Sequence, residues 1–208
     1  MNNLWSVPRF WRGKTVAILA SGPSMSPAVA AAVRAWRLPC IVINDTFKLA
    51  PWADLLYAAD VGWWDCRPQA LDFDGLKVSL QPTSGRLPAQ VLQLLNSGET
   101  GFDPDPHCLR TGGNGGYQAL HLAVHAGAAR VLLFGFDMRG SHWHGDHEAP
   151  LRNPKPHQFA NWIERFAAVA PELARRGVDV VNCTPDSDLT CFRFASLCDL
   201  RQLDAVAA

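Results

Sequence analysis

The sequence has no excess charge of either sign, because its 208 residues include 19 lysines and arginines and 19 aspartates and glutamates. This balance gives no sign of the basic patch or tail with which proteins bind nucleic acid or an anionic membrane. No apolar run approaches the roughly 20 residues that a membrane-spanning helix needs. Residues 1–14 also lack the apolar stretch of a signal peptide. We therefore expect a cytoplasmic protein without a membrane or nucleic-acid partner.

The cysteines lack the spacing of a zinc knuckle or a redox pair, since no two of them form a C-x-x-C motif. They lie in or beside apolar runs, where a free cysteine behaves as a small hydrophobic side chain. Such usage is typical of a reducing compartment. The six residues are Cys40, Cys66, Cys108, Cys183, Cys191 and Cys198.

What the sequence does have is enough apolar material for a large core. Hydrophobic residues make up 48% of the chain and charged residues 18%, a composition that argues against disorder. A chain of this length suits a single domain, so we expect residues 1–208 to form one nucleotide-binding domain.

Short β-branched runs alternate with segments of helical periodicity along the chain. This alternation predicts an α/β fold: a single Rossmann-like, doubly wound, mostly parallel sheet with helices on both faces. Ser26 and Pro27 are typical of a helix start, and Gly127 of a helix end. Residues 81–110 are expected to be loop with one short helix near 88–95. Strands are expected at 14–20, 40–45, 54–60, 76–80, 131–135 and, as the last strand, 178–183.

Small or polar residues follow the carboxyl ends of these predicted strands. In doubly wound sheets the ligand binds beyond those ends, so this edge is the expected working edge. The candidate ligand-binding residues there are Ser21, Gly22, Pro23, Ser24, Asn44, Asp45, Asp60, Gly135, Phe136, Asp137, Asn182, Thr184 and Ser187.

Two small-residue turns, SGPS at 21–24 and TGGNGG at 111–116, each precede a predicted helix. Bare backbone amides and a helix N-terminus favour a phosphate, so both turns are candidate nucleotide-binding loops. Neither matches the dinucleotide or P-loop signature. An ordinary tight turn and a flexible connector are the alternatives. The second turn adds Thr111, Gly112, Gly113 and Asn114 to the candidate nucleotide-binding residues.

The stretch SHWHGDH at 141–147 has the H-x-H-x-D-H spacing of metallo-β-lactamase-type hydrolases. Its metal ligands would be His142, His144, Asp146 and His147. That fold needs further ligands far downstream, whereas the last histidine here is His157. We therefore favour a mobile lid over residues 138–156 whose side chains meet the substrate, and keep the zinc hydrolase as an alternative.

Two further sets of residues admit a functional and a structural interpretation. His121 and His125 are spaced to chelate a metal from one helix, but no third ligand can be assigned, so satisfied structural histidines are favoured. Four tryptophans could stack on a base or sugar, although core packing is expected for most of them. They are Trp63, Trp64, Trp143 and Trp162.

Several stretches in the same order resemble the superfamily of CMP-sialic-acid-dependent bacterial sialyltransferases. They are similar also to a related family that includes flagellin-glycosylation Maf proteins, archaeal 6-hydroxymethylpterin pyrophosphokinases and many phage-encoded proteins. The resemblance covers about residues 14–190 and implies a Rossmann-like fold that binds a nucleotide. The matching stretches are ASGPSM, CIVIND, LRTGGNGGYQALHLAVHAGAARVLLFGFDM, KPHQFANWIERF and VDVVNCTPDSDL.

The resemblance implies that His157 is the general base on the acceptor hydroxyl, a role that suits imidazole near neutral pH. With Asp137 it forms the candidate catalytic pair. The chain departs from the sialyltransferases at Ser21, where they have asparagine, and it lacks the tyrosines that hold the donor phosphate. Other cationic or polar side chains are the candidate phosphate ligands in the lid. They are Arg139, His142, His144, Arg152 and Lys155.

Four functions remain open at this point. The first is a glycosyltransferase that uses a CMP- or UDP-linked sugar and needs no metal cofactor. The second is a diphosphotransferase in which Asp60 and Asp137 hold Mg²⁺ on ATP. The third is a non-catalytic nucleotide-binding phage accessory protein, and the fourth is the zinc hydrolase. The acceptor and a homo-oligomeric state are left open by the sequence.

Overall fold

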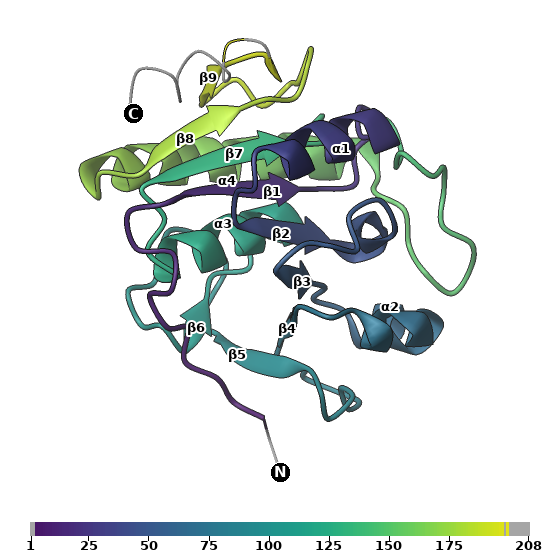
Figure 1. Ribbon diagram of the computed structural model, residues 1–208. Coiled ribbons are helices and arrows are strands. Elements are labelled where there is room, and N and C mark those ends of the chain that lie inside the picture. Colours follow the sequence, from purple (N-terminus) through teal and green to yellow (C-terminus); the bar gives the residue numbers. More distant parts are fainter. Residues whose placement is uncertain (1–2, 198, 200–208) are drawn as a thin grey trace.

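The computed structural model describes residues 3–197 and 199 and contains one sheet in which all strands are parallel (Figure 1). The order of the strands across the sheet is β6-β5-β4-β3-β2-β1-β7-β8-β9. The strands are β1 Thr15–Leu19, β2 Cys40–Ile43, β3 Leu55–Tyr57, β4 Leu76–Leu80, β5 Leu92–Asn96, β6 Cys108–Leu109, β7 Arg130–Phe134, β8 Asp179–Asn182 and β9 Arg193–Phe194. The helices are α1 Pro27–Ala35, α2 Val61–Cys66, α3 Gly115–His125 and α4 Pro156–Arg175, with 3₁₀ turns η1 Asn44–Lys48 and η2 Pro68–Asp72.

The strand order reverses beside β1. The chain moves outward from β1 to β6, then returns to the other side of β1 with β7 and continues to β9. Loops that leave β1 and β7 therefore diverge, and a crevice opens between them at the carboxyl ends of the strands. This topology confirms the expected Rossmann-like α/β fold.

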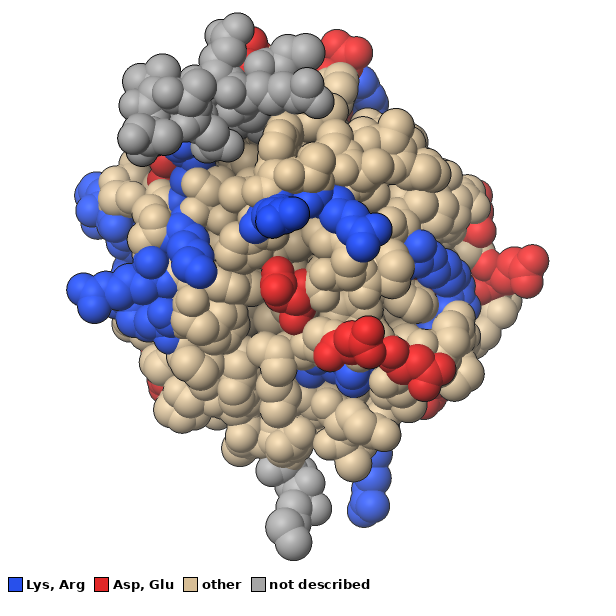
Figure 2. All heavy atoms as spheres, viewed as in Figure 1, with Lys and Arg blue, Asp and Glu red and all other residues tan. Residues whose placement is uncertain are grey.

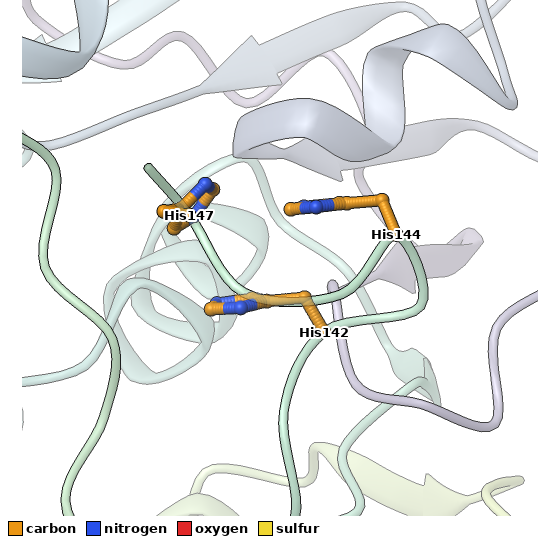
Figure 3. A group of neighbouring side chains, drawn as sticks. All are labelled: His142, His144 and His147. Atoms are coloured by element: carbon orange, nitrogen blue, oxygen red, sulfur yellow. The ribbon is translucent and has the colours of Figure 1, made fainter. Parts of the chain in front are cut away.

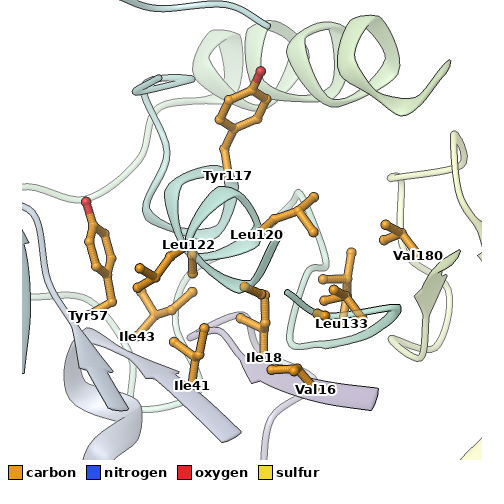
Figure 4. Packing of buried hydrophobic residues seen from close by; sticks show 14 of the residues in the cluster. Val16, Ile18, Ile41, Ile43, Tyr57, Tyr117, Leu120, Leu122, Leu133 and Val180 are labelled. Carbon is orange, nitrogen blue, oxygen red and sulfur yellow. The ribbon is translucent and has the colours of Figure 1, made fainter. Parts of the chain in front are cut away.

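Each face of the sheet carries its own apolar core, because successive strand residues point to opposite faces. Ile18 and Ile41 pack toward α3, whose Leu120 and Leu122 project onto the sheet (Figure 4). Helix α4 covers the same face through residues such as Phe166. The opposite face packs against α1 and α2. Because both faces are covered, the central strands are almost continuously apolar, as parallel sheets require.

The helix ends form as their sequences predict. The Ser26 side chain accepts a hydrogen bond from the Val29 amide, and Pro27 is the first residue of α1. At the other predicted end, Gly127 takes a φ of +92° directly after Ala126 caps α3. A positive φ there stops the helix and turns the chain into β7.

Two local predictions were wrong. The helix expected near 88–95 is instead β5, and residues 81–110 also contain β6. The apolar run is short, and pairing of Leu92 beside Val78 of β4 outweighs its helical spacing. The strand at 178–183 is not the last, because Arg193 pairs beside Val181 to form the exposed β9. An exposed two-residue strand carries no apolar signal.

Among the residues that the structure describes, no helix has both the length and the apolar character needed to cross a membrane.

We expect Phe166→Ala to lower the free energy of unfolding by about 3–5 kcal/mol. The Phe166 ring is fully buried and packs edge-on against Tyr117, Phe136 and Phe192. Denaturant unfolding followed by circular dichroism measures the change. Phe194→Ala is the matched control, because that ring is 48% exposed and its loss should cost less than about 0.5 kcal/mol. Equal losses in both variants would contradict the assignment of Phe166 to the core.

Candidate functional site

A cavity of about 900 Å³ opens at the carboxyl edge of the sheet, where the strand order reverses. Its walls come from the turns after β1, β2 and β7, the start of α3, the loop 138–155 and the first turns of α4.

On the face shown in Figure 2, lysine and arginine side chains are spread among acidic ones and form no continuous basic surface.

Most of the residues expected at the working edge line this cavity. Those that do are Ser21, Gly22, Asn44, Asp60, Gly113, Asn114, Gly135, Phe136, Asp137, Arg139, His142, His147, Arg152, Lys155 and His157. The remaining candidates do not line it: Pro23, Ser24, Asp45, Thr111, Gly112, His144, Asp146, Asn182, Thr184 and Ser187. The tertiary structure thus divides the candidates into residues that a ligand in the cavity can touch and residues that it cannot.

Asp137 joins the two turns that flank the reversal of strand order. Its carboxylate accepts hydrogen bonds from the Ser24 hydroxyl at 2.8 Å and from the Ser24 amide at 3.2 Å. Burial raises the pKa of this carboxyl above its ordinary value, while the Ser24 hydrogen bonds act in the opposite direction. Gly22 passes so close that a Cβ there would overlap the carboxylate and the Gly135 carbonyl oxygen. Ser24 and Asp137 therefore hold the cavity floor, and both Asp137 oxygens are engaged.

The turn after β8 supports Phe136 from behind. The Thr184 hydroxyl accepts a hydrogen bond from the Phe136 amide at 2.9 Å, and the Ser187 hydroxyl donates to the Phe136 carbonyl. Asn182 in turn accepts from the Thr184 amide at 3.0 Å. These buried residues fix the cavity wall without reaching its surface.

The second glycine turn delivers the N-terminus of α3 to the cavity. Gly112 and Gly113 take positive φ values of 54° and 61°, which side chains rarely adopt. The Asn114 side chain then accepts hydrogen bonds from the amides of Gly116 and Tyr117. Gly115 and Gly116, the last two residues of the predicted glycine-rich turn, also line the cavity, although the sequence analysis did not name them individually.

Cationic side chains and one exposed histidine form another part of the cavity wall. Arg152, Lys155 and His157 are exposed and line the cavity, and His157 lies in the first turn of α4. Arg139 also lines the cavity but pairs with Asp188 at 3.1 Å.

Aromatic side chains complete the wall on α4. Phe159 and Trp162 lie one helical turn apart, with ring centroids 5.3 Å from each other, and both line the cavity. Trp63 reaches the cavity from α2 but is nearly fully buried. Trp64 is core, and the Trp143 indole donates to Thr46. Nothing in the sequence marked Phe159 as a site residue except that it lies two positions after His157.

The histidines of SHWHGDH converge beside the cavity (Figure 3). His142, His144 and His147 each offer one ligand nitrogen, and these nitrogens lie within 4.8 Å of one another. The His142 and His144 rings are nearly parallel, with their centroids 5.1 Å apart. Asp146 does not join them, because its carboxylate accepts a hydrogen bond from Ser141. Within residues 3–197 and 199, this is the one group of three such side chains.

A buried carboxylate from another element lies next to this cluster. Asp45 of η1 is fully buried, and its Oδ2 is 3.9 Å from His147 Nδ1. Burial would raise the pKa of Asp45, but hydrogen bonds from Arg67, Lys48 and Trp63 lower it to about 2. Burial also lowers the pKa of the three imidazoles, which favours their neutral form.

The helical pair His121 and His125 has structural partners. His121 Nε2 lies 3.0 Å from the Asp103 carbonyl, and its Nδ1 accepts a hydrogen bond from the Arg110 amide at 3.2 Å. His125 Nε2 lies 2.9 Å from the Cys108 carbonyl. Burial lowers the pKa of His121 to about 3. These imidazoles hold the 102–110 segment against α3.

No protein-family model and no curated protein matches the chain. The resemblance to the sialyltransferase-like superfamily therefore stays a prediction.

We expect Gly22→Ala to destabilise the protein by about 1–3 kcal/mol, because the new methyl group must displace Asp137 and the Gly135 backbone. Thermal and denaturant unfolding measure the change. Gly62→Ala is the control: a Cβ at Gly62 meets no atom within 4 Å, so that variant should be neutral or slightly stabilised. A neutral Gly22→Ala would contradict the tight junction.

Stability should fall as the pH drops below about 6.5. The unfolded chain protonates His121 near its ordinary pKa of 6.5, whereas the folded protein resists until about pH 3. The folded state binds fewer protons between these values, so acid favours unfolding by about 2 kcal/mol at pH 5 for this residue. Urea titrations at pH 8 and pH 5 should give a smaller difference for His121→Gln than for the wild type. Equal differences would contradict this role of His121.

Proposed function

We propose that the protein is a nucleotide-binding transferase that moves a sugar from a nucleotide-activated donor to an acceptor hydroxyl. The observation that carries the proposal is the cavity at the reversal of strand order, with a glycine-rich helix start on one wall and cations on another. Its volume of about 900 Å³ falls within the roughly 300–1,000 Å³ usual for small-molecule sites.

The donor phosphate would lie between the start of α3 and the cations. A helix N-terminus favours an anion, and Gly113 and Gly115 leave the backbone bare for close approach. Arg152 and Lys155 line the same cavity and would neutralise the charge that develops on the leaving nucleotide. Phe159 and Trp162 offer apolar rings for the base or the sugar.

His157 would act as the general base. Its exposed imidazole lines the cavity at the first turn of α4, so an acceptor hydroxyl can approach it from solvent. The hydroxyl proton would pass to the imidazole while the hydroxyl oxygen bonds to the anomeric carbon. The bond from that carbon to the donor phosphate would break, and the nucleotide would depart.

The arrangement of carboxylates favours this transfer over the Mg²⁺-dependent diphosphotransfer. Both Asp137 oxygens accept hydrogen bonds from Ser24, which leaves Asp60 as the more available of the two expected Mg²⁺ ligands. Mg²⁺ on nucleotide phosphates is usually held by one or two carboxylates, so a pair would have been the stronger indication.

The test measures binding of a panel of nucleotides. Binding is detected as a rise in the thermal unfolding temperature of the protein, recorded once with Mg²⁺ and once with EDTA. CMP, CDP, UDP, ADP, ATP and their sugar conjugates form the panel. We expect a pyrimidine nucleotide to stabilise the protein without Mg²⁺, by about 2.7 kcal/mol at 100 times its dissociation constant. Arg152→Ala should weaken binding of the nucleotide by at least about tenfold, since a charge-assisted contact is lost. Binding that occurs only for ATP with Mg²⁺ would overturn the proposal in favour of diphosphotransfer.

The catalytic role is tested by His157→Gln once a donor has been found. We expect the rate of donor turnover to fall by about 100-fold or more while nucleotide affinity stays within about twofold. Lys14→Gln is the control and should change neither quantity. Lys14 is exposed and directly precedes β1, so it lies at the amino ends of the strands, away from the cavity at their carboxyl ends. Unchanged turnover in His157→Gln would remove the general base and leave a binding protein.

A further inference from the structure

We propose that His142, His144 and His147 bind one divalent transition-metal ion at the wall of the cavity, with Asp45 as the nearby carboxylate that offsets the charge of the ion. This inference stands on the geometry of the cluster and does not require the transferase function.

The first support is the convergence of otherwise unsatisfied nitrogens. His142 Nδ1, His144 Nε2 and His147 Nδ1 are buried and have no hydrogen-bond partner in the part of the chain that the structure describes. A buried polar nitrogen without a partner costs about 1–3 kcal/mol, so three such atoms in one short loop are costly unless they share a ligand. A shared metal ion bound by these nitrogens, including His147 Nδ1, would satisfy all three.

The spacing is close to what an ion requires. The ligand nitrogens lie within 4.8 Å of one another. Three nitrogens bound about 2.1 Å from a tetrahedral zinc ion are about 3.4 Å apart. Rotations of the side chains would supply the difference, since the three rings lie close together on one loop (Figure 3).

The backbone that carries the histidines is fixed on both sides. The Trp143 amide donates to Ser21 at the end of β1, and its indole donates to Thr46 of η1. His147 exchanges two hydrogen bonds with the Asn153 side chain, at 2.7 and 3.0 Å. Gly145, at a φ of +87°, allows the turn between them, in which its amide donates to the His142 carbonyl. The three imidazoles are thus held together before any ion arrives.

Asp45 supplies the negative charge that a dication needs nearby. It is fully buried, and its Oδ2 lies 3.9 Å from His147 Nδ1. At this distance Asp45 makes no hydrogen bond to the imidazole, so it would act through its charge, which lowers the cost of holding a dication beside the three neutral rings. Lys48 and Arg67 pair with the other oxygen and keep Asp45 ionised.

The donor set indicates the class of metal. Three neutral imidazoles suit zinc, cobalt, nickel or copper and disfavour Mg²⁺ and Ca²⁺, which prefer oxygen. Three protein ligands leave a fourth position for water or substrate. Because His142 and His147 line the cavity, that position is expected to face the bound ligand.

The assignment differs from the H-x-H-x-D-H pattern in its carboxylate. That pattern would use Asp146, which instead accepts a hydrogen bond from Ser141 on the exposed side of the loop. The structure brings Asp45, about 100 residues earlier in the chain, to the cluster instead. The two assignments make opposite predictions for one substitution.

The experiment is a titration of the EDTA-treated protein with Co²⁺, in which binding is monitored by visible absorption. Zn²⁺ is then added to test whether it displaces the bound Co²⁺. We expect one equivalent of Co²⁺ to bind with the intense bands of a four-coordinate site and to be displaced by Zn²⁺. His144→Gln should weaken binding by more than about 100-fold, and Asp45→Asn by about 10–100-fold. Asp146→Asn should bind as the wild type does. His107→Gln, an exposed histidine outside the cluster, is the matched control.

Each result decides the proposal. Absence of saturable Co²⁺ binding to the folded wild type, or equal binding by His144→Gln, would overturn it. Loss of the site in Asp146→Asn, with folding verified by circular dichroism, would overturn the role of Asp45 in favour of Asp146. His144 does not line the cavity, so His144→Gln should retain nucleotide binding. Metal binding without nucleotide binding would therefore leave this inference standing while the proposed function fails.

Discussion

The hydrogen bonds between Asp137 and Ser24 are the constraint on which the cavity depends. They join the turn after β1 to the turn after β7, at the point where the strand order reverses. Loops leave these two strands toward opposite faces of the sheet. The backbone pairing of β1 with β7 continues only as far as the bond from the Gly22 amide to the Gly135 carbonyl, and the Ser24–Asp137 contacts extend the junction beyond it. A buried carboxylate that accepts from both an amide and a hydroxyl fixes their separation. Gly22 is required there because the two turns approach too closely for a side chain.

The other features of the cavity are built outward from this junction. Trp143 attaches the loop 138–155 to Ser21, at the end of the same β1 turn. This attachment brings the histidine cluster to one side of the cavity and Arg152, Lys155 and His157 to its rim. The groups proposed to bind an anion and those proposed to bind a metal therefore share one cavity, although they come from elements that are distant in the chain. A ligand bound there would contact groups of both kinds.

Sequence reasoning was most successful where the signal is local. Buried strands are short apolar runs, and caps such as Ser26 and Gly127 act on their own helix, so both can be recognised without a partner. It failed for β5 and β9, which exist because a neighbouring strand is already in place. It also could not separate Ser24, Thr184 and Ser187, which support the wall, from Ser21, which lines it. Both kinds are small polar residues after a strand.

The sequence by itself determined the parallel α/β fold and the edge at which polar residues gather, since both follow from the order of apolar runs. It also supplied a loop dense in histidines. Only the tertiary structure decided that three of these converge, that Asp146 turns away, and that Asp45 lies beside them. The physical reason is that side-chain direction in a loop depends on distant anchors, here Ser21 and Thr46, which no local pattern encodes.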